Sequence, residues 1–117
     1  MSVDLEPALC ALAVDYWKLL RAYERLVADE TGAKAARLSA QARYADGRLT
    51  SHLDDAGMML MTFDGQDITP EIPVIAVNAD DLASARQAIV SQTLEPAIVA
   101  GPRVLAMGRV IACEGDA

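Results

Sequence analysis

The chain has 117 residues, of which 53% are hydrophobic but only 4% aromatic, and it carries a net charge of −7. This composition supports a compact module with an aliphatic core and excludes a disordered chain. Residues 1–56 hold 9 acids against 7 bases, and residues 57–117 hold 8 acids against 3 arginines. Neither half therefore offers the basic surface that nucleic acid or an anionic membrane requires.

No uncharged apolar stretch reaches the roughly 18 residues that a membrane span needs. The apolar run at residues 8–14 also lacks the basic start of a signal peptide. We therefore expect a cytoplasmic protein.

Residues 1–56 are predicted to be helical, with Asp4 as a first cap and Pro7 in the first turn. A heptad seam of apolar residues follows: Leu5, Leu9, Leu12, Tyr16, Leu19, Tyr23 and Leu26. Such a seam is typical of helices that pack on one another along their length. We expect it to form a homodimer interface, and its tyrosines favour a wide one such as a four-helix bundle. The alternative is that the seam packs within one chain.

A second apolar stripe, rich in alanine, begins at Ala35 and is out of register with the first. The change occurs around Gly32, which either ends a helix and produces a helical hairpin or lies inside one bent helix. Asp46 and Gly47 mark a second candidate break in the helix.

Gly57 is the predicted boundary to a β-rich module. An apolar run at 58–63 and extended residues at 68–73 come first, and the strand candidates are 74–77, 94–100, 104–105 and 109–113. A short helix is predicted over residues 82–90. The expected fold class is α+β, with a helical dimerisation region at residues 1–56 and a small β-rich partner-binding module at residues 57–117.

The sequence offers few groups for chemistry. His52 precedes Asp54 and Asp55, but no second His or nearby Cys completes a catalytic or metal site, so a solvated face is expected. The turn at 64–67 lacks the ligand spacing of a calcium loop. Cys10 and Cys113 are expected to be buried, reduced thiols. We therefore predict no catalytic residue, no cofactor and no metal, and we do not expect an enzyme.

Three short motifs resemble the GrpE family of nucleotide exchange factors for Hsp70 chaperones. They are Leu49, Leu53 and Gly57, then Phe63, Asp64 and Pro70, then Pro96, Ala97, Ile98 and Val99. In that family, paired helices lead through a Leu-x3-Leu-x3-Gly segment into a small β domain. The resemblance covers about residues 49–99. The chain departs from the family in its short helical region, in the helix predicted at 82–90 and in the residues that follow Val99.

The resemblance implies a co-chaperone that holds an Hsp70-type partner in an open conformation. The predicted partner-binding residues are Met59, Met61, Phe63, Ile68 and Ile72. The alternative is a structural or assembly subunit whose role is to form the oligomer. An enzyme with its site at the dimer interface would need acids or histidine on the seam, and the seam has none.

Overall fold

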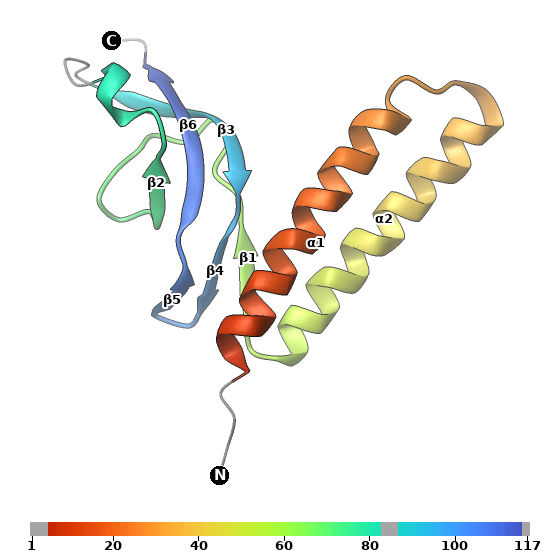
Figure 1. Ribbon diagram of the computed structural model, residues 1–117, viewed down its shortest axis with the longest axis horizontal. Helices are drawn as coiled ribbons and strands as arrows, with labels where there is room; N and C mark the ends of the chain where they lie inside the picture. The colour runs from red at the N-terminus through yellow and green to blue at the C-terminus, as the bar shows by residue number, and fades with distance from the viewer. Residues whose placement is uncertain (1–4, 83–86, 116–117) are drawn as a thin grey trace. The chain divides into compact units, whose positions relative to one another are not determined.

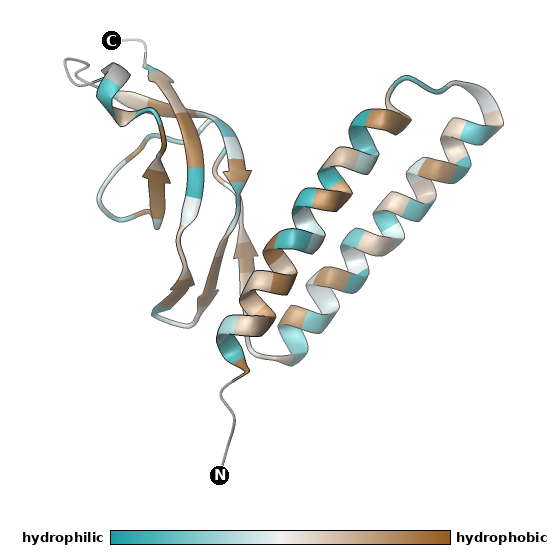
Figure 2. Ribbon diagram, in the orientation of Figure 1, coloured by the Kyte–Doolittle hydropathy of each residue, from teal (hydrophilic) through white to brown (hydrophobic). Residues whose placement is uncertain are grey.

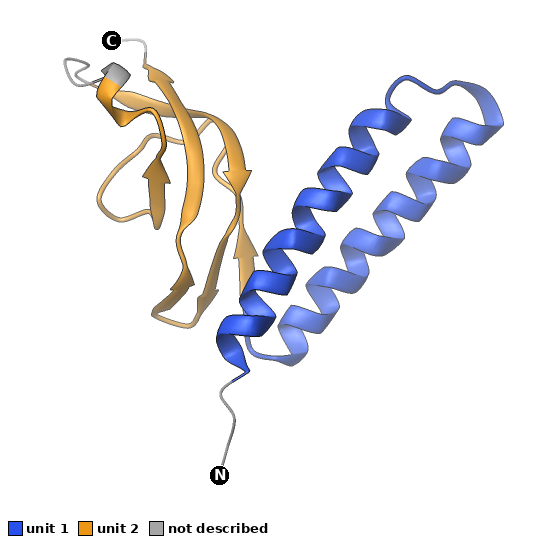
Figure 3. Cartoon of the chain, viewed as in Figure 1, with its two compact units in different colours: residues 1–58 blue, residues 59–117 orange. Residues whose placement is uncertain are grey.

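The computed structural model describes residues 5–82 and 87–115, and the chain divides into two units (Figure 3). Residues 1–58, which hold both helices, form the helical unit, and residues 59–117, which hold the described strands, form the β unit. Two helices followed by strands confirm the predicted α+β fold. The predicted cap Asp4 lies outside the described residues.

The helical unit is a hairpin of α1 (Glu6–Val27) and α2 (Gly32–Asp55), which run antiparallel side by side (Figure 1). Of the two alternatives at Gly32, the hairpin is therefore correct. Gly32 opens α2 with a φ of 75°, which a side chain rarely tolerates. The predicted break at Asp46 and Gly47 is wrong, because α2 continues through both residues. One glycine inside a helix costs only about 0.5–1 kcal/mol, which the rest of α2 tolerates.

The end of α2 explains the spacing of Leu53 and Gly57. Gly57 has a φ of 73°, and its N–H donates to the carbonyl of Asp54 at 3.0 Å. The N–H of Met58 donates to the carbonyl of Leu53 at 2.8 Å. These two bonds form a Schellman motif, in which glycine takes the left-handed position and the residues around it pack together. Leu53 and Met58 are accordingly both buried.

The β unit contains six described strands in two three-stranded sheets. The strands are β1 (Met59–Met61), β2 (Val74–Ala76), β3 (Ala88–Glu95), β4 (Ala97–Ala100), β5 (Arg103–Ala106) and β6 (Gly108–Glu114). One sheet has the order β1-β4-β5 and is antiparallel. The other has the order β2-β6-β3, in which β2 is parallel and β3 antiparallel to β6.

The last four strands form a long hairpin that passes from one sheet to the other. Its turn follows β4 at Gly101, which has a φ of 59°. Pro96 separates β3 from β4, because proline cannot donate to the ladder. Gly108 lies close to this bend, where an added Cβ would meet Ala97 N and Glu95 O, each at 3.3 Å. The close approach of the two backbones therefore requires glycine at this position.

The predicted helix over residues 82–90 is wrong at its C-terminal end. A short 3-10 helix covers Ala79–Leu82, residues 83–86 lie outside the described residues, and β3 begins at Ala88. Ile89 and Val90 pair with β6 instead. Both are β-branched and suit a pleated, half-buried surface better than a helix.

Phe63 occupies the centre of the β-unit core with 0% exposure, together with Val90, Ala97 and Val110. The turn that follows Phe63 is hydrogen-bonded to β3. Asp64 Oδ1 accepts from the N–H of Thr93 at 2.6 Å, and Thr93 Oγ1 accepts from the N–H of Phe63 at 3.1 Å. This part of the polar turn therefore has a structural role.

Candidate functional site

The residues of the predicted seam fall into two groups, one exposed and one that faces α2. Its leucines at seven-residue spacing are exposed: Leu5 by 67%, Leu12 by 66%, Leu19 by 74% and Leu26 by 72%. We call these four residues the leucine face. Figure 2 shows hydrophobic residues recurring along α1, whereas α2 is largely hydrophilic or neutral. Aliphatic side chains of this size are usually buried, so four in one line are a candidate contact surface.

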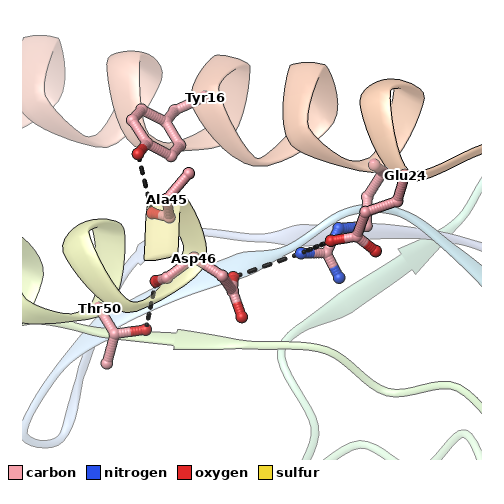
Figure 4. A network of polar contacts seen from close by, with 6 residues as sticks. Tyr16, Glu24, Ala45, Asp46 and Thr50 are labelled. Atoms are coloured by element: carbon pink, nitrogen blue, oxygen red, sulfur yellow. Dashed lines mark hydrogen bonds and ion pairs between the residues drawn. The ribbon is translucent and has the colours of Figure 1, made fainter. Parts of the chain in front are cut away.

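The other seam residues are turned toward α2 of the same chain. The Tyr16 hydroxyl donates to the carbonyl of Ala45 at 2.8 Å (Figure 4). The Tyr23 hydroxyl lies 3.3 Å from the carbonyl of Leu38 and 3.2 Å from Gln41 Oε1. Leu9 is half-buried. The tyrosines therefore hold the hairpin together within one chain, and a dimer interface along the seam stays a prediction.

An apolar groove of about 280 Å³ lies beside Leu19, between the two helices. We call it the α1–α2 groove, and its lining residues are Tyr16, Leu19, Leu20, Tyr23, Gln41, Ala42 and Ala45. The groove exists because α2 places alanines opposite two tyrosines, and small side chains do not fill the space. Both tyrosine hydroxyls bond to α2, so the rings are held in place as its walls.

Polar contacts tie the helices together close to this groove. Arg21 Nη2 lies 3.3 Å from Asp46 Oδ1 on α2 and 3.0 Å from Glu24 Oε1 (Figure 4). Its guanidinium also lies over the Trp17 ring, 5.3 Å from the centroid. These side chains are partly exposed, so each ion pair adds little stability. Together with the Tyr16 hydrogen bond, the contact between Arg21 and Asp46 sets the alignment of α1 against α2.

The predicted partner-binding residues have different environments. Phe63 is a core residue with no exposure and is not available to a partner, which corrects that prediction. Met61, Ile68 and Ile72 are half-buried against the same core. Met59 is 60% exposed and is the one of the five that offers a large apolar surface.

Met59 belongs to a partly exposed row, with Val99 half-buried in its middle, that the sequence did not reveal. Met59 pairs with Val99, and Val99 pairs with Val104, so the three residues cross the sheet β1-β4-β5 on one face. Val104 is 47% exposed. Hydrophobicity alone gave no signal for this row, since the register of the strands creates it.

The titratable residues that the sequence singled out lie in different environments. Among the described residues, no group of three His, Cys, Asp or Glu side chains is placed to hold a metal ion. His52 is exposed on α2, as are Asp54 and Asp55. Cys10 is buried, and this burial, followed by the nearby charge of Glu6, raises the pKa of its thiol. Cys113 is exposed, which corrects the prediction that both thiols are buried.

Neither helix of the described chain combines the length and the apolar character needed to cross a membrane. Comparison with protein-family models gave no match to this chain. Comparisons with curated proteins and with solved structures gave none either. The GrpE resemblance therefore stays a prediction that rests on its motifs.

Proposed function

We propose that this chain is a protein-binding module that acts as a GrpE-like co-chaperone. It forms a homodimer through the helical unit and binds an Hsp70-type partner through the β unit, holding that partner in an open conformation. The observation that carries the proposal is the leucine face, because exposed leucines in one continuous line are typical of a protein contact.

The connection between the units supports the co-chaperone part. Leu49 and Leu53 are buried, and Gly57 takes the left-handed conformation that ends α2. β1 begins two residues later, at Met59. The motif thus covers the end of a paired helix that leads into the β unit, which is the order of parts that the resemblance implies.

The row formed by Met59, Val99 and Val104 supports a partner surface on the β unit. Methionine is unbranched and polarizable, so it adapts to different partner surfaces. An exchange factor acts through binding, so the proposal requires no catalytic group from this chain.

The direct test is the release of labelled nucleotide from an Hsp70-type ATPase of the same cell. We expect the chain to accelerate release, and the double variant Met59→Asp/Val104→Asp to lose most of this acceleration. Thr62→Asp/Gln66→Asp, which adds the same two charges at exposed residues outside this row, serves as the matched control and should remain active.

No acceleration at saturating wild-type protein would reject the co-chaperone role. If the protein then still formed a dimer, the structural or assembly role would be favoured instead. Equal acceleration by the wild type and the double variant would show that the partner binds elsewhere on the chain.

A further inference from the structure

The geometry of the leucine face is regular enough to define its partner. Successive leucines are seven residues apart, which is about 10.5 Å along a helix. Leu5 to Leu26 therefore form one line of about 32 Å on the side of α1 that the hairpin leaves open. A line with this repeat matches another helix that carries the same repeat.

We propose that the leucine face and the α1–α2 groove together bind a second copy of this chain, with a leucine of each copy inserted into the groove of the other. This inference rests on the homodimer of the proposed function and identifies the surface that forms it. Each chain supplies both the projecting leucine and the cavity that receives it, as a two-fold interface requires.

The register brings a leucine to the groove whichever way the second copy runs. The groove is centred near Leu19, between Tyr16 and Tyr23. In a copy that runs the same way in register, Leu19 is level with it. In a reversed copy that sets Leu5 against Leu26, Leu12 is level with it. The repeat of seven thus makes the face complementary to itself.

The chemistry of the groove also favours a leucine over a polar ligand. Its walls are aromatic rings and alanines, and the two tyrosine hydroxyls are already bonded to α2. A polar ligand would therefore lose its hydration and find few new hydrogen bonds. The net charge of −7 also disfavours an anionic membrane surface as the occupant.

The test is sedimentation equilibrium of the full chain over a range of concentrations, with reductant present so that exposed Cys113 forms no disulfide. We expect the wild type to reach twice the 12.4 kDa of one chain. Leu12→Asp/Leu19→Asp should raise the dimer dissociation constant by about thirtyfold or more. Ala11→Asp, on the exposed side of α1 but off the leucine face, should leave it unchanged. Circular dichroism checks that each variant keeps its helices.

The groove is tested separately by filling it. Ala45→Leu leaves the leucine face intact but occupies the groove, so we expect the dissociation constant to rise by about tenfold. Ala36→Leu, on the opposite side of α2, is the matched control and should have no effect. If Ala45→Leu dimerises as the wild type does, the inserted leucine is refuted.

Two further outcomes overturn the whole inference. One is a wild type that stays at 12.4 kDa, with or without binding to vesicles of phosphatidylcholine and phosphatidylglycerol. The other is a double leucine variant that dimerises as the wild type does, which would place the dimer contact elsewhere. Because nucleotide release is measured independently of mass, failure here is distinguishable from failure of the co-chaperone role.

Discussion

The substitution Phe63→Ala tests whether Phe63 is a core residue or a contact for a partner. Phe63 is fully buried among Val90, Ala97 and Val110, and removing a buried phenylalanine side chain costs about 3–5 kcal/mol. Natural proteins have about 0.05–0.15 kcal/mol of stability per residue, which gives about 3–9 kcal/mol for the 59–117 unit. This one substitution should therefore remove a large part of the stability of the β unit.

Native-state hydrogen exchange measures this loss residue by residue. The N–H of Val90 is bonded to the carbonyl of Gln66, so its exchange reports opening of the core. We expect its free energy of opening to fall by about 3–5 kcal/mol in Phe63→Ala, or to the limit set by the stability of the unit. Met59→Ala is the control, and its loss should stay within about 0.5 kcal/mol because Met59 is largely exposed. A loss under about 1 kcal/mol in Phe63→Ala, combined with weaker partner binding, would refute the core assignment.

Further substitutions and a thiol measurement test other parts of the fold. Gly47→Ala should raise the urea midpoint and stabilise α2 by about 0.5–1 kcal/mol, because Gly47 is helical and nothing lies within 4 Å of an added Cβ. Gly108→Ala should destabilise the chain by about 1–3 kcal/mol in the same assay, since its Cβ would lie 3.2–3.3 Å from an aromatic carbon and two backbone atoms. Asn78→Ala removes two hydrogen bonds to the β6 backbone, of 2.8 and 2.9 Å, and should cost about 1–3 kcal/mol of unfolding free energy. In native protein, iodoacetamide should modify Cys113 rapidly and Cys10 slowly, as mass spectrometry would show. Burial raises the Cys10 thiol pKa, so its thiolate forms only at higher pH than usual.

Local patterns in the sequence located the change between the two helices, although they left open whether Gly32 ends a helix or lies inside a bent one. The apolar period of α1 and the alanine stripe of α2 are out of register, and the change falls at Gly32, where α2 begins. Leu53 and Gly57 have the spacing of a Schellman motif, whose hydrogen bonds lie within six consecutive residues. Such features are predictable because the atoms that form them are close in the chain.

The short helix predicted over residues 82–90 failed for the opposite reason. Ala88 and Ile89 have a spacing that suits a helix face, but they pair with β6, about 25 residues further along the chain. Pairing over that distance depends on the whole sheet, and it overrides local preference. Met59 was predicted, but its neighbours Val99 and Val104 were missed for the same reason, since strand register brings the three together.

The sequence by itself determined that Leu5 and Tyr16 belong to one heptad seam, because spacing decides which residues share a face of a helix. Only the tertiary structure decided what covers each part of that face. The tyrosines are held by α2 through their hydroxyls, while the leucines stay exposed beside a groove that Ala42 and Ala45 leave open. The difference arises because α2 packs against the side of the seam that carries the tyrosines. A single alanine-rich helix is too narrow to cover the leucines as well.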